Sequence, residues 1–500
     1  MNALVALPVL LPLLGAALTL LLATRDRPQR VVSVACLAAT LAVAAVLLVR
    51  TYRHGPLVIE IGGWPAPVGI VLVADQLAAL MLVVSSAVTL CVLLYSIGQG
   101  QSDASENTPV AIFHPTYLVL TAGVTNAFLA GDLFNLFVGF EMLLAASFVL
   151  ITLNGTPLRI RTGSTYVVVN ILASMIFLIS VGLVYAATGT LNLAHLAHRL
   201  DALPDGLRLS LQLMLLVAFG IKAAVFPLSA WLPDSYPTAP APVTAVFAGL
   251  LTKVGVYAII RTQTLLFPGP RAAALLLVVA GLTMLVGILG AVAQSDLKRL
   301  LSFTLVSHIG YMIFGIGLST VAGLVGAIFY VVHHITIQTA LFLVTGLVEE
   351  KTGSTDLRQL GGLARIKPLL GVLFFVSAMN LAGIPPFSGF LGKLGLLQAG
   401  VAAGGPLPWI LVALGTLTSL LTLYVASRVW SIAFWRAPGP AVASTVPLPT
   451  LMVGATVALV ALGVGLTVVA GPLFDVTTGA AVDLHERTPY IHAVLPGGRP

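Results

Sequence analysis

Four ionisable residues lie inside strongly apolar stretches of this sequence. Glu141 falls within NLFVGFEMLLAASFVL, and the other three are Lys222, Lys253 and Lys393. A charge at the centre of a membrane helix costs about 2.5–3.5 kcal/mol on insertion scales, which makes it a functional candidate. Burial disfavours the charged form of both residue types, so a buried Glu–Lys couple can exchange a proton where a surface pair cannot. A static ion pair that fixes helix packing is the alternative, but three lysines exceed what one glutamate requires.

Polar side chains at helical spacing extend this series. Spacings of three and four residues place them on one helix face, and in lipid such a face must point inward. The four stripes are Tyr166, Asn170 and Ser174; Lys253, Tyr257 and Arg261; Thr304, His308 and Tyr311; and His334, Gln338 and Thr345. We expect a proton relay of Glu141, Lys222, Lys253, His308, His333, His334 and Lys393, supported by Asn170, Tyr257, Tyr311 and Gln338. For each histidine alone, an ordinary interior hydrogen bond is the alternative.

The adjacent histidines His333 and His334 raise the question of a metal site. Neighbouring positions on a helix point to different faces, and no Asp, Glu or Cys stands near them in the sequence to complete a ligand set. We therefore expect no metal. The sequence also contains no phosphate-binding loop, dinucleotide fingerprint or plausible nucleophile triad, so we expect neither a cofactor nor enzymatic catalysis.

Two proline-broken apolar stretches position two of the lysines. FGIKAAVFPLSAWLPD carries Lys222 before Pro227, and MNLAGIPPFSGFLGKL carries Lys393 after Pro385 and Pro386. The two stretches can be overlaid, with residues 224–232 falling on residues 383–391. Matching interrupted helices in two halves of a chain are typical of transporters built from inverted repeats. A simple kink without a functional role is the alternative, since neighbours often re-satisfy the freed backbone groups.

The composition fixes the class of protein around these residues. Hydrophobic residues make up 58% of the 500 residues and charged residues 8%, and apolar runs of about 20 residues recur along the chain. We expect an all-α polytopic membrane protein with about 14 spans. Alternation of polar and apolar residues in segments of about ten, which would indicate a β-barrel, is not found.

The expected organisation has four parts. Residues 1–109 hold three helices and a small surface hairpin around 57–73; 110–262 hold a first five-helix repeat; 271–436 hold a second; and 437–500 hold the last helix and an extramembrane tail. Five is an odd number of spans, so the second repeat must enter the membrane from the opposite side and be inverted. The breaks fall in the seventh and twelfth spans. Residues 191–203 are expected to form an interfacial amphipathic helix.

Charge and cysteine content indicate the orientation in the membrane, the kind of partner and the absence of disulfide bonds. The net charge of +7 reflects basic residues in short loops, with more on one side of the expected membrane than on the other. This bias places both termini outside a cytoplasmic membrane and gives no reason to expect nucleic acid as a partner. The first apolar run, 4–22, is expected to be a retained span. Both cysteines lie in apolar runs, so no disulfide framework is expected.

These residues resemble a known family. The glutamate on the fifth span and the lysines on the seventh, eighth and twelfth are similar to those of the antiporter-like subunits shared by respiratory complex I, membrane-bound hydrogenases and the multi-subunit Mrp-type Na⁺/H⁺ antiporters. The stretches FGIKAAVFPLSAWLPDSYPTAPAPVTAVFAGLLTKVGVYAIIR and LAGIPPFSGFLGKLGLL look most like the D-subunit family of the Mrp antiporters. The resemblance implies a proton-carrying Glu–Lys pair and central polar axis, no cofactor, and other membrane subunits as partners.

One residue departs from the pattern of the resembled family. Many relatives have a second titratable residue, a lysine, four positions after the histidine on the eleventh span, whereas here His334 is followed by Gln338. Glutamine does not titrate, so the link between the two halves would depend on His308, His333, His334 and water. Two alternatives to an antiporter subunit stay open at this point: a proton-pumping subunit of a redox complex, and a scaffold whose buried charges only hold helices together.

Overall fold

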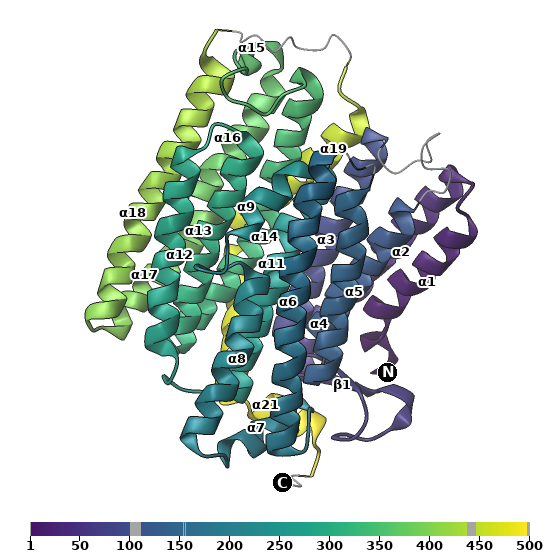
Figure 1. Ribbon diagram of the computed structural model, residues 1–500, viewed down its shortest axis with the longest axis vertical. Coiled ribbons are helices and arrows are strands. Elements are labelled where there is room, and N and C mark those ends of the chain that lie inside the picture. Colours follow the sequence, from purple (N-terminus) through teal and green to yellow (C-terminus); the bar gives the residue numbers. More distant parts are fainter. Residues whose placement is uncertain (1, 101–111, 154, 156, 438–446, 498–500) are drawn as a thin grey trace.

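The computed structural model describes residues 2–100, 112–153, 155, 157–437 and 447–497. It is a bundle of long helices that run roughly along one direction, with a two-stranded hairpin at one end (Figure 1). In the first half the elements are α1 (Leu7–Leu21), α2 (Asp26–His54), β1 (Leu57–Glu60), β2 (Val71–Ala74), α3 (Gln76–Gln99), α4 (Phe113–Leu129), α5 (Leu133–Thr152), α6 (Pro157–Thr188), α7 (Leu193–Asp201), α8 (Asp205–Ala223), α9 (Trp231–Ser235), α10 (Ala241–Val246) and α11 (Thr252–Arg261). In the second half they are α12 (Ala273–Ala293), α13 (Leu297–Gly317), α14 (Val321–Thr352), α15 (Leu363–Ile366), α16 (Pro368–Ala382), α17 (Ser388–Ala403), α18 (Pro406–Val429), α19 (Thr450–Val468), α20 (Ala470–Glu486) and α21 (Thr488–Val494).

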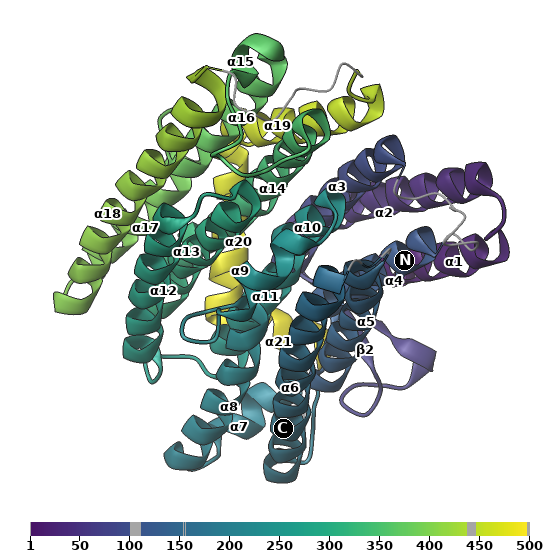
Figure 2. The ribbon, with the colours of Figure 1, turned by 45° about the horizontal axis from the view of Figure 1, so that its top comes forward.

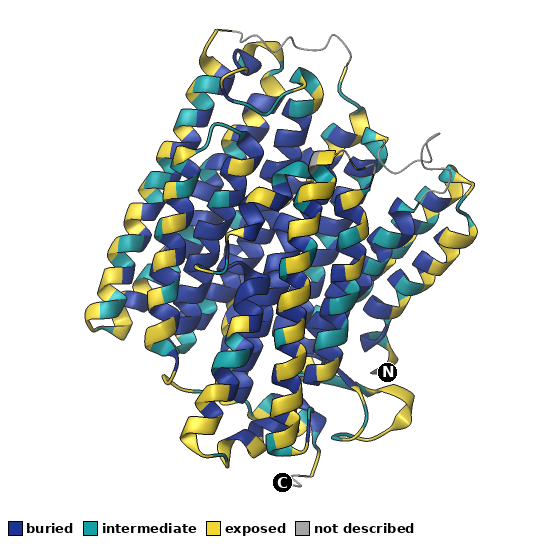
Figure 3. Cartoon of the chain, viewed as in Figure 1, coloured by how far each residue is buried: buried dark blue, intermediate teal, exposed yellow. Residues whose placement is uncertain are grey.

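The helices agree with the expected membrane spans. In the described part of the chain, eleven helices are long and apolar enough to cross a membrane. The other three expected spans correspond to α1, to α4, whose expected start lies in residues that are not described, and to the pair α16 and α17. Helices on the outside of the bundle present apolar side chains outward, while the centre is buried (Figure 3). The all-helical membrane fold is confirmed.

Both expected helix breaks are present, and they begin at equivalent residues. α8 ends at Ala223 and α16 at Ala382, and the next residues, Ala224 and Gly383, both have left-handed backbone conformations (φ 59° and 85°). These two residues are the ones that the sequence overlay aligns. After the break the chain resumes as α9 in the first half and as α17 in the second. The broken helices expose backbone carbonyls at the ends of α8 and α16 inside the bundle.

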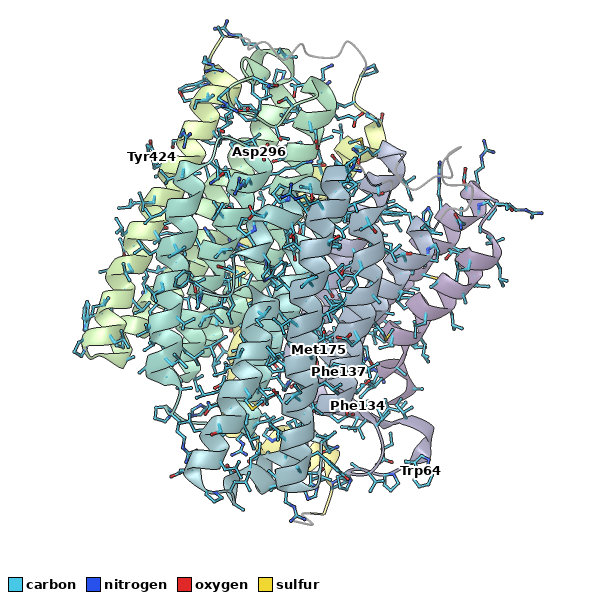
Figure 4. All side chains as sticks on the ribbon, viewed as in Figure 1. Trp64, Phe134, Phe137, Met175, Asp296 and Tyr424 are labelled. Atoms are coloured by element: carbon cyan, nitrogen blue, oxygen red, sulfur yellow. The ribbon has the colours of Figure 1, made fainter. Side chains whose placement is uncertain are left out.

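The inverted repeat is visible in two matching backbone bridges. Asp132, just before α5, pairs with Asn192 before α7, and Asp296, just before α13, pairs in the same antiparallel way with Asp356. Figure 4 shows Asp296 near one end of the bundle, whereas Phe134, at the start of α5, lies toward the other end. Equivalent helices of the two units therefore run in opposite directions.

The end of the bundle that holds the hairpin is the more elaborate one. β1 and β2 pair from Leu57 with Ala74 to Glu60 with Val71, in the stretch where a hairpin is expected. The short helix α7 lies at this end, and so does α21 (Figure 1). The segment after Gly471, expected as a tail outside the membrane, is largely helical: α20 packs against α14 and α3 and runs within the bundle in Figure 2. Its depth in the bilayer stays a prediction.

The break between α16 and α17 requires a residue without a side chain at position 389. A Cβ there would clash with the Asn380 carbonyl oxygen and would lie 2.9 Å from the His333 ring. We expect Gly389→Ala to destabilise the protein by about 1–3 kcal/mol, because neither backbone nor ring can move freely. Thermal unfolding in detergent measures this. Gly395→Ala is the matched control on α17, since its Cβ would meet nothing closer than 4.0 Å; equal effects of the two changes would contradict the prediction.

Candidate functional site

Glu141 and Lys222 are joined through one serine hydroxyl. Ser174 on α6 donates a hydrogen bond to Glu141 Oε1 on α5, and Lys222 Nζ on α8 donates to Ser174 Oγ at 2.9 Å. Lys222 Nζ also donates to the Asn170 carbonyl oxygen at 3.2 Å, and Lys222 is 4% exposed. All donors point the same way, from ammonium to hydroxyl to carboxylate. A proton can therefore pass from the lysine to the glutamate by a short shift along two hydrogen bonds.

Aromatic side chains surround the Glu141–Lys222 pair on one side. Phe137 and Phe140 on α5, Phe177 on α6 and Phe219 on α8 form a cluster with ring centroids 4.8–6.1 Å apart. Lys222 Nζ lies 5.8 Å from the centre of the Phe140 ring. Glu141 itself is only half-buried within the described chain, which differs from the fully buried position expected. Phe134, Phe137 and Met175 are drawn on the near side of α5 and α6 in Figure 4.

Lys253 lies deeper than any other charged residue of the proposed relay. Its side chain is fully buried, and Nζ donates to the Ala248 carbonyl oxygen at 2.6 Å. Ala248 belongs to a π-helical turn, Phe247–Leu251, which joins α10 to α11. This turn packs so closely on α14 that a Cβ on Gly249 would clash with Thr339 Oγ1. The π-helical turn therefore supplies a carbonyl for the lysine while holding it against the central helix.

Lys393 binds the broken end of α16. From α17, its ammonium donates to the carbonyl oxygens of Leu381 (3.1 Å) and Ala382 (3.0 Å) and to Ser419 Oγ (2.9 Å). The last carbonyls of a helix carry partial negative charge, so a cation is favourable there. Lys393 Nζ also lies 5.1 Å from the centre of the Tyr311 ring. No carboxylate pairs with Lys393 among the described residues.

The histidines occupy the space between the two halves. His308 on α13 and His334 on α14 have ring centroids 5.3 Å apart, and His308 Nδ1 lies 2.6 Å from the Tyr330 hydroxyl. Both nitrogens of His334 are buried without a hydrogen-bond partner in the described chain. His333 points elsewhere, with Nδ1 3.0 Å from Ser388 Oγ at the start of α17. The two adjacent histidines thus serve different faces of α14, as their spacing predicts.

Gln338 completes the centre but does not replace a titrating group. Its Nε2 donates to the Leu301 carbonyl oxygen of α13 at 2.8 Å, while Oε1 is buried with no partner that the described residues supply. Of the other supporting residues, Tyr311 shares its hydroxyl with Thr418 at 2.8 Å. Asn170 contributes its carbonyl to Lys222. Gln338 therefore offers a buried hydrogen-bond acceptor one helical turn from His334, and its amide does not titrate.

Comparison with known proteins identifies the family. The model of the family described as NADH:quinone oxidoreductase/Mrp antiporter, TM matches residues 130–422. The D subunit of the Na⁺/H⁺ antiporter of Alkalihalophilus pseudofirmus is 42% identical over 503 residues, covering 99% of this chain and 100% of that protein. The chain belongs to the NADH:quinone oxidoreductase/Mrp antiporter family.

Solved structures of family members extend the match to the whole fold. A chain of the Mrp complex from Dietzia sp. DQ12-45-1b has a TM-score of 0.91 and 34% identity, covering 99% of this chain and 100% of that one. A chain of the membrane-bound sulfane sulfur reductase, an archaeal respiratory membrane complex, has a TM-score of 0.88 and 26% identity with the same coverage. The resemblance seen in the sequence, including that to the D-type subunits of Mrp antiporters, is confirmed.

Sequence reasoning missed several residues of the site. Ser174 stands in a stripe noted from the sequence, but its spacing did not reveal that it bridges Glu141 and Lys222. Tyr330, Ser388 and Ser419 contact relay residues from other helices, and only tertiary packing reveals such contacts.

The largest omission is a buried ion pair between Asp75 and Arg261. Arg261 Nη1 donates to Asp75 Oδ2 at 2.6 Å and Nη2 to Oδ1 at 2.9 Å. Arg261 Nη2 also donates to the Tyr257 hydroxyl at 3.1 Å, and the guanidinium lies 5.0 Å from the centre of the Tyr490 ring. Arg261 ends an inward-facing stripe noted from the sequence, but the separation of the two residues along the chain gave no sign that they meet. The pair ties α3, α11 and α21 together.

Asp75→Asn should reveal how much the buried pair contributes. The asparagine can still accept from the Ala78 amide that Asp75 caps, but Arg261 loses its counter-charge in the interior. We expect a loss of about 3–5 kcal/mol in the free energy of unfolding, because an uncompensated charge stays buried. Thermal unfolding of the detergent-solubilised protein measures it. Asp205→Asn, which breaks the exposed pair with Arg271, is the control and should cost at most about 1 kcal/mol.

Proposed function

We propose that this chain is the proton-translocating subunit of a hetero-oligomeric antiporter that exchanges protons for a monovalent cation, Na⁺ in the first instance. The chain is a transporter subunit and not an enzyme. Full-length similarity to the D subunit of a Na⁺/H⁺ antiporter supports the type of transport. The observation that carries the proton role is the hydrogen-bond path from Lys222 through Ser174 to Glu141.

The remaining relay residues extend this path across the protein. Protons reach Lys222 and Lys253 in the first repeat, cross by way of His308, His334 and water, and leave near Lys393. Lys393 suits the exit end of the proton path because its ammonium binds carbonyls and a hydroxyl. These neutral acceptors stabilise the protonated lysine less than a carboxylate would. Glu141 modulates Lys222 by accepting or returning a proton.

The proposal also covers the placement of the chain in the membrane and its partner subunits. The chain lies in the cytoplasmic membrane with both termini outside, as the distribution of basic loop residues indicates. Glu141 is half-buried in the isolated chain, so a neighbouring membrane subunit covers this side of α5 and α6 in the complex. No carboxylate cluster for Na⁺ is evident in the sequence, and the cation passes mainly through partner subunits.

A proton-pumping subunit of a redox complex is the second candidate. The likeness to a chain of an archaeal respiratory membrane complex favours it, at a TM-score of 0.88. The antiporter is preferred because identity is higher to the antiporter subunit, 42%, than to that chain, 26%. Purification of the native complex separates the two: small membrane subunits without redox centres indicate the antiporter, and iron–sulfur subunits indicate the redox complex.

The bridging serine provides a specific test of the path. Ser174→Ala removes both hydrogen bonds while leaving the fold of α6 unchanged. A hydrogen bond to a charged group contributes about 1.5–3 kcal/mol, so we expect ΔpH-driven cation exchange in everted vesicles to fall about tenfold or more. Ser180→Ala, on the same helix, removes only a bond to the Ile176 carbonyl and should exchange normally. Equal activity of both variants would exclude a bridging role.

Removing the two ends of the relay tests the function itself. Glu141→Gln and Lys393→Ala should each abolish most cation-linked proton movement in everted vesicles, because each removes a titrating group from the path. Subunit assembly is checked by co-purification of the partner subunits. If both variants assemble and retain full ΔpH-linked exchange, the buried charges are structural and the proposal is wrong.

A further inference from the structure

A polar pocket lies at the hairpin end of the first repeat, away from the relay. It is a cavity of about 380 Å³ between the hairpin turn, the start of α5, the end of α6 and the start of α7. Its lining includes Asp132, Asn192, His195, Phe134 and Tyr185. Asp132 and Asn192 are 7% and 2% exposed, although they border the cavity. Charged and amide groups buried to this degree are expected to have hydrogen-bond partners.

The backbone bridge holds Asp132 and Asn192 side by side. The Leu133 amide donates to the Leu191 carbonyl and the Leu193 amide to the Gly131 carbonyl, which makes residues 132 and 192 a non-hydrogen-bonded antiparallel pair. Side chains of such a pair lie close together on one face. Asp132 Oδ1 caps α5 by accepting from the Asn135 amide at 2.6 Å, but Oδ2 has no partner in the described chain.

Two further polar residues of the pocket, Asn192 and His195, each have an N–H donor without a partner among the described residues. Asn192 Oδ1 accepts from the amides of Ala194 and His195, while its Nδ2 is buried and has no partner among the described residues. Arg199 Nε donates to His195 Nε2 at 3.1 Å. His195 Nε2 is therefore an acceptor, and the ring proton of the neutral imidazole is on Nδ1. That Nδ1 is also buried without a partner in the described residues.

The second repeat has the same backbone bridge, but there both carboxylate oxygens of the aspartate have hydrogen-bond partners. Asp296 Oδ1 accepts from the Arg299 amide, the equivalent cap, and its Oδ2 accepts from the Thr355 hydroxyl. Its cross-strand neighbour Asp356 binds Arg358. The open carboxylate oxygen at Asp132 is thus not required by the bridge or by the cap, because the other copy of this arrangement has none.

The donor and acceptor pattern selects the ligand. Asp132, Asn192 and His195 line one pocket, and between them they leave one carboxylate oxygen and two N–H donors without partners in the described chain. A bare cation would be repelled by the donors, and an anion by the carboxylate. Water satisfies all three groups at once, since it accepts from the N–H groups and donates to the carboxylate. The cavity has room for on the order of ten water molecules.

We propose that this pocket is a proton-exchange site, in which a water cluster held by Asn192 and His195 delivers protons to Asp132 and removes them. The inference deepens the proposed function, on which it rests, by placing an opening of the proton path at the hairpin end of the first repeat. His195 fixes the water but does not carry the proton, because the Arg199 guanidinium occupies the nitrogen that would have to accept it.

The route inward from Asp132 follows polar groups on α4 and α5. The Asn135 amide donates the hydrogen bond that Asp132 accepts, and Asn126 Nδ2 donates to Asn135 Oδ1 at 3.1 Å. Further along α4, the Phe128 carbonyl accepts from Tyr257 at 2.6 Å, and Tyr257 stands one turn from Lys253 on α11. The direct way along α5 to Glu141 is occupied by the aromatic cluster of Phe137, Phe140, Phe177 and Phe219. Polar groups therefore extend from the pocket toward Lys253, whereas aromatic rings lie in the direction of Glu141.

The pKa of Asp132 lies near neutral pH, where a carboxyl group can both bind and release protons. Burial raises the pKa of its carboxyl to about 6, against the lowering effect of the nearby Asn135 and Phe134 amides. The titratable and charged groups around it are His195, His198 and Arg199 on α7, Tyr185 on α6 and Tyr490 on α21. Burial, followed by the charges of Arg199 and His198, lowers the pKa of His195.

Two variants of the assembled antiporter complex test the site. Asp132→Asn keeps the cap on α5 and removes the titrating group. Asn192→Asp keeps the cap on α7 and places a second carboxylate beside Asp132, which should shift its midpoint to higher pH. Asp296→Asn, at the equivalent place in the second repeat, is the control. Infrared difference spectra of the purified complex between pH 4 and 8 report carboxyl protonation, and reconstituted vesicles report cation-linked proton exchange against pH.

We expect a protonated-carboxyl band with a midpoint near pH 6 that is lost in Asp132→Asn, moves to higher pH in Asn192→Asp and is unchanged in Asp296→Asn. Exchange should fall severalfold in Asp132→Asn at alkaline pH, where protons are scarce, and stay normal in Asp296→Asn. An unchanged band in Asp132→Asn, or full exchange at every pH, overturns the proposal. Normal exchange in Glu141→Gln and Lys393→Ala would instead refute the proposed function, and the infrared titration is independent of that result.

Discussion

The cost of keeping charge away from water governs this structure. The four ionisable residues of the proposed relay lie within a bundle whose outer surface is apolar, and each charge must be balanced by groups that the bundle itself provides. The balancing groups differ from site to site. A serine hydroxyl lies between Lys222 and Glu141, a carbonyl of a π-helical turn accepts from Lys253, and carbonyls at a helix end accept from Lys393. Each of these arrangements requires an irregularity in a helix or a contact between helices, so the placement of charge and the breaks in the backbone depend on one another.

Much of this arrangement could be predicted from the sequence. The apolar runs predicted the spans, and the odd number of spans per repeat predicted the inversion. The overlay of the two proline-rich stretches predicted two matching breaks at Pro227 and at Pro385 and Pro386, which in the structure begin three and two residues earlier, at Ala224 and Gly383. What sequence could not provide were contacts between distant helices. Nothing local marks Asp75 as the partner of Arg261, or Ser419 as a ligand of Lys393, because these pairs form only when the helices pack.

The two repeats show how one scaffold supports unequal chemistry. The backbone bridge before α5 and the one before α13 are the same, and both first half-helices end on a left-handed residue. The polar groups attached to these places differ. One bridge closes its carboxylate with a threonine and the other leaves it open to a cavity, and one lysine precedes its break while the other follows it. The two repeats therefore share backbone geometry at these places and differ in the polar groups that it carries.

The hydrogen bonds of Lys393 have a mechanical consequence. A protonated ammonium has three N–H groups, and here all three have acceptors: two carbonyls of the last turn of α16 and one hydroxyl on α18. A neutral amine has only two. When the proton leaves, one acceptor must lose its partner, and the attraction between the ammonium and the negative end of α16 disappears. Loss of this proton would therefore loosen the joint between α16 and α17, so that a chemical step at one atom would become a change in how two half-helices are held together.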